Sequence, residues 1–192
     1  MMKFKEFIHY DKVMYVRDKC MYLRHLFKYP YMTFKEVKII KEVLNRYSSK
    51  RIEVFEYGSG YSTLYFPRYL RKNSYDFLWT AVENSQEWYH RIHGQIRDFR
   101  INLNLIKGVN EYINFPSQEY DVIIVDSPRD WRKECLLKAR RHLKKGGCAI
   151  LHDAQHIHYH SCFEVYGSQE IIDTGRLAFK QRPLQKLWIG YE

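Results

Sequence analysis

The apolar residues of this chain follow a helical period first and then alternate between strand-like and helical patterns. Thr33 and Glu36 have the spacing of a capping box, which marks the start of a helix. Apolar residues then recur at helical spacing and predict an amphipathic helix to about Tyr47; they are Phe34, Val37, Ile40, Val43 and Leu44. The pattern breaks at residues 48–51, and the alternation of strands and helices begins after it.

Five short apolar stretches predict the strands of a sheet. They cover residues 52–57, 77–82, 101–106, 121–125 and 148–151. The stretch 121–125, with the sequence DVIIV, has an unbroken apolar centre. Such a strand is typical of a parallel sheet that is covered on both faces.

The segments between these strands have helical patterns. One helix is predicted at 62–71, where Pro67 should shorten or kink it. A second begins at Asn84 or Ser85, with an apolar face that includes Trp88, Tyr89, Ile92, Ile96 and Phe99. A third spans about 132–145 and ends at Gly146, with Cys135, Leu136, Ala139 and Leu143 facing inward.

Two further strands are predicted near the end of the chain, at 176–180 and 186–191. Pro183 lies in the short connection between them, which favours an antiparallel pair. The order of elements therefore predicts a doubly wound, Rossmann-like α/β domain over residues 33–192. Its seven-stranded sheet is mostly parallel, with a C-terminal antiparallel hairpin and helices on both faces.

Composition is consistent with one globular domain. The chain has 192 residues, of which 45% are hydrophobic and 28% charged, enough to form a core without disulfide or metal staples. The four cysteines form no C-x-x-C pair, and we expect them to be buried, reduced thiols. No 18-residue apolar run is present, and charged residues interrupt the first ten positions. We therefore expect a cytoplasmic protein with no membrane partner.

The net charge of +10 is concentrated near the N-terminus. Residues 1–50 hold 12 Lys and Arg against 5 Asp and Glu, a net of +7. Within this stretch, we expect residues 1–32 to form a basic, aromatic-rich leader before the predicted domain. Two interpretations remain open: a surface that grips nucleic acid or another polyanion, or a helical layer whose basic residues face water.

Candidate chemistry lies where the predicted strands end. Gly58-Ser59-Gly60 follows the first strand, which allows a tight turn and the approach of a ligand to bare backbone. The third glycine of the dinucleotide fingerprint is missing, since position 63 is Thr. Glu83 ends the second strand, 23 residues after Gly60, where a carboxylate can accept hydrogen bonds from both hydroxyls of a ribose.

These features together resemble class I S-adenosylmethionine-dependent methyltransferases. The resemblance rests on Glu56-x-Gly58-x-Gly60, Glu83, Asp126 at the end of the fourth strand, and Gly146-Gly147-x-x-x-Leu151. It implies S-adenosylmethionine as cofactor, with the Gly58–Gly60 backbone facing its methionine part and Glu56 ordering that loop or contacting the amino group. It also implies Glu83 at the ribose and residues 108–110 beside the adenine. The cofactor-binding residues implied are Glu56, Gly58, Ser59, Gly60, Ser62, Thr63, Glu83, Asn84, Val109 and Asp126.

The ends of the fourth and fifth strands define the expected reacting side. The resemblance implies that these two strands are neighbours, and neighbouring strands lie about 5 Å apart. Asp126 and Asp153 could then share a metal ion or divide the roles of base and orienting group. This arrangement resembles that of metal-assisted O-methyltransferases. Those proteins usually have an Asp-Asn pair after the fifth strand, whereas here Ala154 follows Asp153. The candidate metal ligands are Asp126, Asp153 and His156; His156 or His152 as a general base requires no metal.

A narrower resemblance is to polysaccharide O-methyltransferases of the glucuronoxylan type. It rests on Asp126-Ser127-Pro128-Arg129 and Leu151-His152-Asp153, and it implies an acidic sugar whose carboxylate Arg129 would bind. The candidate catalytic residues are thus Asp126, Asp153, His156, His152 and Arg129.

The predicted function is O-methylation of a small-molecule or sugar hydroxyl. One alternative is an RNA or DNA methyltransferase that uses the basic leader, although the fourth strand is not followed by the Asp/Asn-Pro-Pro-aromatic pattern of base methylases. Another is a non-catalytic binding module on the same fold.

Overall fold

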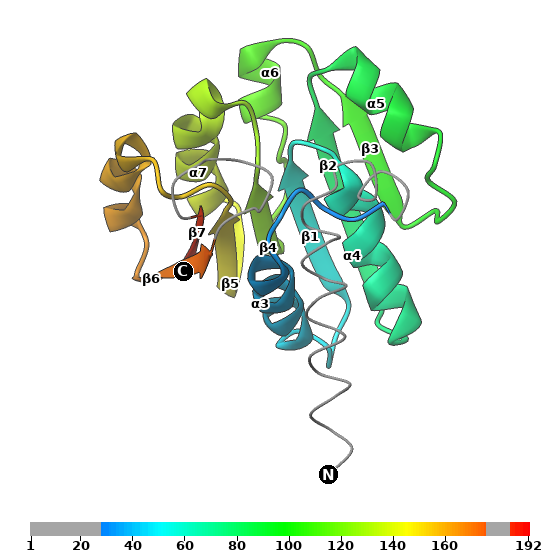
Figure 1. Cartoon of the computed structure of the whole chain (residues 1–192), viewed down its shortest axis with the longest axis horizontal. Helices are drawn as coiled ribbons and strands as arrows, with labels where there is room; N and C mark the ends of the chain where they lie inside the picture. Colours follow the sequence, from blue (N-terminus) through cyan, green and yellow to red (C-terminus); the bar gives the residue numbers. More distant parts are fainter. Residues whose placement is uncertain (1–27, 176–184) are drawn as a thin grey trace.

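The apolar stretch around residues 121–125 forms the central strand of the sheet. This strand, β4 (Tyr120–Val125), is buried at every position. It pairs in parallel with β1 (Ile52–Tyr57) on one side and with β5 (Leu143–Leu151) on the other. The computed structural model describes residues 28–175 and 185–192 (Figure 1).

Seven strands form one sheet in the order β3-β2-β1-β4-β5-β7-β6. On one side of β4 the chain moves outward through β1, β2 (Phe77–Glu83) and β3 (Ile101–Leu105), all parallel. The strand order reverses between β1 and β4. In a doubly wound sheet this reversal opens a crevice at the carboxyl ends of the two strands, which lie at the upper edge of the sheet in Figure 1.

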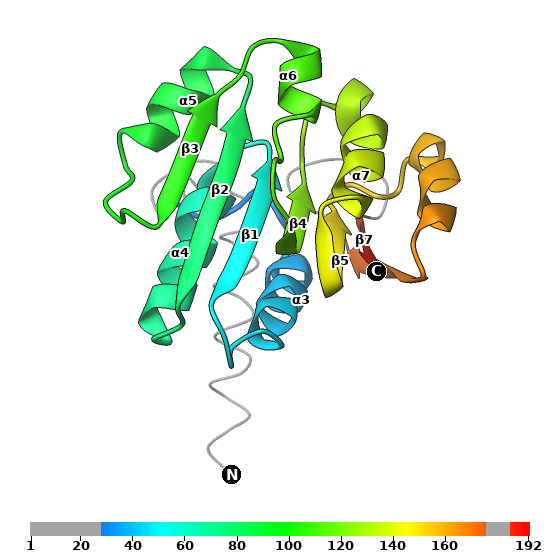
Figure 2. The same ribbon diagram turned by 180° about the vertical axis from the view of Figure 1, so that it is seen from behind.

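Helices cover both faces of the sheet, as predicted. One face carries α3 (Phe34–Asn45), α4 (Tyr61–Lys72) and α5 (Gln86–His93). The opposite face carries α6 (Val109–Ile113), α7 (Arg132–Arg140) and the 3₁₀ helix η2 (Ile157–Val165) (Figure 2). Successive residues of β1 point to opposite faces of the sheet, so each face has its own core. Val54 belongs to the core under α3, α4 and α5, and Phe55 to the core under α6, α7 and η2.

The C-terminal hairpin is present, but its first strand lies earlier than predicted. β6 (Ser168–Gly175) pairs antiparallel with β7 (Gln185–Tyr191), and β7 also pairs antiparallel with β5. The predicted strand at 176–180 lies outside the described residues. β6 is an edge strand with mostly exposed side chains, so its polar sequence gave no strand-like alternation.

The third predicted helix is too long. Helix α7 ends at Arg140, and β5 begins at Leu143, which is buried as the partner of Tyr120 in β4. Gly146 is therefore not a helix cap: it lies within β5 at a φ of +74°, in the part of the strand where the pairing register shifts. The turn between helix and strand consists of Arg141 and His142 alone, and neither is a residue type typical of turns, so the sequence pattern shows no boundary there.

The second predicted helix also ends early. α5 stops at His93, so Ile96 lies beyond it, and Phe99 is 95% exposed instead of facing the core. Pro67, by contrast, lies inside an uninterrupted α4.

Two further expectations can be compared with the described residues. Cys135, Cys148 and Cys162 are free and buried, as expected. None of the helices in residues 28–175 is long and apolar enough to cross a membrane.

Candidate functional site

The loop after β1 lies directly against the end of β4. The Asp126 N–H donates to the Tyr57 carbonyl at 2.8 Å, and the Gly58 N–H donates to Val82 at 3.0 Å. Gly58 has a φ of +88°, and a Cβ atom there would lie 2.3 Å from the Asp126 carbonyl oxygen. Only glycine allows this approach, which places the glycine loop and Asp126 at one point.

Glu56 ties this loop to the sheet. Its fully buried carboxylate accepts hydrogen bonds from Ser62 at 2.5 Å, Thr63 at 2.7 Å and the indole N–H of Trp79 at 2.8 Å. Burial raises the pKa of Glu56 to about 7, although these three donors oppose the rise. Glu56 therefore orders the start of α4 against β1 and β2. Trp79 was not predicted as part of the site, because in the sequence it is only an aromatic residue within an apolar strand.

Glu83 joins the end of β2 to the same loop. One of its oxygens, Oε2, accepts hydrogen bonds from the backbone N–H and the hydroxyl of Ser59, both at 2.9 Å. The other, Oε1, accepts from the N–H groups of Asn84 at 2.9 Å and Ser85 at 2.8 Å. The predicted ribose acid and the predicted cofactor loop are thus in direct contact. Val109 is exposed at the start of α6, after β3.

The expected reacting side contains Asp126, Arg132 and His152 in direct contact. Asp126, partly exposed at the end of β4, has its Oδ1 2.6 Å from Arg132 Nη2 and 3.1 Å from His152 Nδ1. Arg132 also donates to the carbonyls of Ser127 at 2.7 Å and His152 at 3.0 Å. Asp126 Oδ2 has no hydrogen-bond or ion-pair partner among the described residues.

Asp153 completes this group from the other side of Arg132. Its Oδ2 lies 3.4 Å from Arg132 Nη1, and its backbone has a φ of +59°, an unusual conformation for a residue other than glycine. Burial opposes its charge, but His152 and Arg132 together lower the pKa of Asp153 to about 2.

His152 is buried within these charges. Burial favours its neutral form, but Asp126 and Glu36 outweigh this and raise its pKa to about 10. Glu36, on α3, has its Oε1 3.8 Å from His152 Nε2. Neither of these two buried atoms has a hydrogen-bond partner in the described chain.

Two members of this group, Arg132 and Glu36, were not predicted as site residues. Arg132 was placed only as the start of a helix, and Glu36 only as part of a capping box. A signal for Glu36 was present, because it stands four residues before Ile40 on the apolar face of α3.

The metal site predicted from Asp126, Asp153 and His156 does not form. Arg132 and His152 supply positive charge to both carboxylates, in the place that a cation would take. No group of three or more His, Cys, Asp or Glu side chains in residues 28–175 and 185–192 could hold a metal ion. The donor set therefore does not fit a metal.

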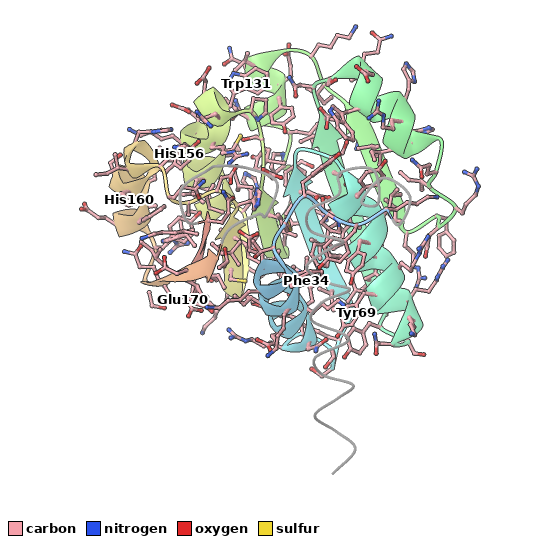
Figure 3. All side chains as sticks on the ribbon, viewed as in Figure 1. Phe34, Tyr69, Trp131, His156, His160 and Glu170 are labelled. Atoms are coloured by element: carbon pink, nitrogen blue, oxygen red, sulfur yellow. The ribbon has the colours of Figure 1, made fainter. Side chains whose placement is uncertain are left out.

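The other histidines of this region diverge from His152. His156 is partly exposed just before η2, and Figure 3 shows His160 further out than His156. His160 Nε2 is 3.2 Å from the Ala154 carbonyl, and His158 is exposed. Partial burial and the charge of Arg129 lower the pKa of His156 below its usual value. Arg129 itself is exposed on the 3₁₀ turn η1 (Arg129–Trp131).

Comparison by sequence gives no match to a protein-family model or to a curated protein. Comparison by structure gives many. A candidate O-methyltransferase from Klebsiella pneumoniae aligns over 93% of this chain and 89% of its own, with a TM-score of 0.66 at 14% identity. The N-methyltransferase NodS from Bradyrhizobium japonicum, in complex with S-adenosyl-L-homocysteine, aligns over 94% and 96%, with a TM-score of 0.59 at 13% identity.

A candidate class I S-adenosylmethionine-dependent methyltransferase from Listeria monocytogenes aligns with a TM-score of 0.64 at 16% identity. The alignment covers 84% of this chain but 60% of the Listeria protein, so this chain spans less than two thirds of its length. These likenesses show that the chain has the class I methyltransferase fold.

Replacing Gly58 tests the contact between the loop and β4. We expect Gly58→Ala to lower the free energy of unfolding by about 2 kcal/mol or more, because it adds both a left-handed alanine and an overlap with the Asp126 carbonyl. Denaturant unfolding measures this. Gly60→Ala is the matched control, since its Cβ would meet nothing closer than Ser62 Oγ at 3.7 Å. Equal losses in both variants would contradict the prediction.

The raised pKa of His152 predicts a stability that depends on pH. Between the ordinary histidine pKa of about 6.5 and the folded value of about 10, the folded state binds more protons than the unfolded state. The stabilisation is therefore complete below pH 6.5 and is lost as the pH rises. We expect the free energy of unfolding to fall between pH 7 and 9 by up to about 1.4 kcal/mol per pH unit.

His152→Gln should make this dependence shallower, whereas the exposed His158→Gln should leave it unchanged. Parallel pH profiles for the wild type and His152→Gln, measured by urea unfolding, would show that His152 is not the group responsible.

Proposed function

We propose that this protein is an S-adenosylmethionine-dependent methyltransferase that methylates a hydroxyl group of an acidic sugar. The observation that carries the proposal is the junction of the Gly58–Gly60 loop, Glu83 and Asp126 at one edge of the sheet. The fold supports the general activity; the sugar substrate rests on the resemblance of the segments 126–129 and 151–153.

The residues at this edge fit the cofactor. A Cβ on Gly60 would meet nothing closer than Ser62 Oγ at 3.7 Å, so a ligand has room to approach the backbone there. Glu83 would hold the ribose. The ribose hydroxyls would then donate to Glu83 in place of the Ser59 hydroxyl, which now donates to Oε2. Val109 would lie beside the adenine. The carboxylates of Glu83 and Asp126 suit a cationic ligand.

S-adenosylmethionine supplies a methyl group already activated on a sulfonium, so the protein has mainly to position the acceptor. Asp126 is placed for this task. Arg132 and His152 both hold its Oδ1, which leaves Oδ2 to accept a hydrogen bond from the substrate hydroxyl. The hydroxyl held there would lose its proton as its oxygen accepts the methyl group that bound S-adenosylmethionine would supply.

His156 is a better acceptor for that proton than His152. His152 is already protonated at neutral pH, because its pKa is about 10. His156 has a lowered pKa and a partly exposed ring, so it is neutral at pH 7. Asp153, with a pKa of about 2, is a weak base and serves to hold Arg132.

Arg129 would bind the carboxylate of the sugar. Its neighbour Arg132 is occupied by Asp126 and Asp153, whereas Arg129 is exposed on η1 after β4. A guanidinium can form two parallel hydrogen bonds with a carboxylate, which would fix the sugar beside Asp126.

Calorimetry with S-adenosylmethionine tests the cofactor part of this proposal. We expect the wild type to bind and Glu83→Gln to bind at least about tenfold more weakly, since it loses a charged acceptor at the ribose. The control is Glu87→Gln, an exposed carboxylate on α5 that pairs with Arg91. Absence of binding by the wild type would refute the proposed function.

A methyl-transfer screen with labelled cofactor tests the substrate class. We expect label in sugars that contain uronic acid and none in catechols or total RNA, with no loss of activity in EDTA because the carboxylates are held by Arg132. His156→Gln should lower kcat by about a hundredfold, and the exposed His158→Gln should not change it. Labelling of RNA instead of sugars would favour the nucleic-acid alternative.

A further inference from the structure

A line of neighbouring charged side chains runs from α3 to the proposed methyl-transfer point. It begins at Glu36, whose side chain is fully buried, passes through His152, and ends at Asp126 Oδ1. The imidazole lies between two carboxylates, with Nδ1 3.1 Å from Asp126 and Nε2 3.8 Å from Glu36. Three elements distant in the sequence therefore meet through one ring.

The helix cap uses only one of the two carboxylate oxygens of Glu36. Its Oε2 accepts the Thr33 N–H at 2.6 Å, which completes the capping box of α3. Its Oε1 accepts no hydrogen bond in the described chain, and the facing Nε2 of His152 donates none. Leaving both atoms buried and unpaired is unfavourable, and a small movement of either side chain would bring them into hydrogen-bond contact.

The charges facing His152 make this contact favourable. Glu36 comes from α3, Asp126 from the end of β4, and Asp153 from the end of β5, while Arg132 comes from α7. With His152 protonated, three negative and two positive groups leave one excess negative charge. Without Glu36 the imidazolium would lose one of its three carboxylate neighbours.

We propose that Glu36 is a positioning residue of the active site, which fixes the His152 ring so that Nδ1 holds Asp126 Oδ1 and leaves Oδ2 toward the substrate. The role of Asp126 in this inference rests on the proposed function. The contact between Glu36 and His152 does not depend on it. Helix α3 is thereby a part of the site and not only a cover for the sheet.

Glu36→Gln tests this role with little change in volume. The amide oxygen can still accept the Thr33 N–H, so the helix cap is kept while the charge toward His152 is lost. We expect kcat to fall by about tenfold or more and the Kd for S-adenosylmethionine to stay unchanged. The control is Glu42→Gln on the same helix, an exposed residue that pairs with Lys38 and should keep full activity.

Combining the substitutions separates positioning from a purely structural effect. His152→Gln alone should lower kcat as much as Glu36→Gln, and the double variant should lose no more, because both act through Asp126. Losses that multiply in the double variant, or a kcat of Glu36→Gln equal to that of the wild type, would overturn the proposal.

Thermal unfolding provides a readout that needs no methyl transfer. Glu36→Gln should lower the Tm of the wild type by roughly 3 °C or more, but have no effect in the His152→Gln background. Equal Tm losses in both backgrounds would overturn the contact itself. Failure of the wild type to bind S-adenosylmethionine would refute only the proposed function.

Discussion

The parallel pairing of β1 with β4 is the constraint on which the site depends. These two strands are far apart in the sequence, and the strand order reverses between them. Their carboxyl ends meet so closely that Gly58 lies against the Asp126 carbonyl, where no other residue fits without strain. Through this contact the Gly58–Gly60 loop and the carboxylates of Glu83 and Asp126 share one edge of the sheet, where we propose that the cofactor binds and the methyl group is transferred. A shift of β1 relative to β4 would move the Gly58–Gly60 loop away from Asp126, and so the proposed cofactor site away from the proposed methyl-transfer point.

Burial of charge is the second principle of the site. Glu56 has three neutral donors and no buried cation, so its charged form is disfavoured and its pKa rises. Asp153 is also largely buried, but Arg132 and His152 keep it ionised. The same type of side chain thus serves as an ordering group in one place and as part of an ion-pair network in the other. The network retains an excess negative charge where the proposed cofactor would bring a sulfonium.

The accuracy of the sequence-based prediction varied with the sharpness of the local pattern. β1, β2 and β4 were predicted to within a residue because an apolar run bounded by polar residues marks each of them. The predicted boundary between α7 and β5 was wrong, because an apolar residue such as Leu143 suits either element and the turn at Arg141 and His142 contains no residue type typical of turns. β6 was missed because its exposed edge needs no apolar side chains. The positions of Glu56, Glu83, Asp126 and Asp153 at strand ends were predicted, because strand ends are local features.

The sequence by itself determined the order of the elements, the glycine turn after β1 and the acidic residues at the ends of the strands. Each of these follows from residues close together in the chain. Only the tertiary structure decided which partners the charged groups have. Arg132 takes the place between Asp126 and Asp153 that a metal ion was predicted to fill, and Glu36 reaches His152 across 116 positions of sequence. Electrostatic pairing depends on distance in space, and neither residue type nor spacing along the chain specifies that distance.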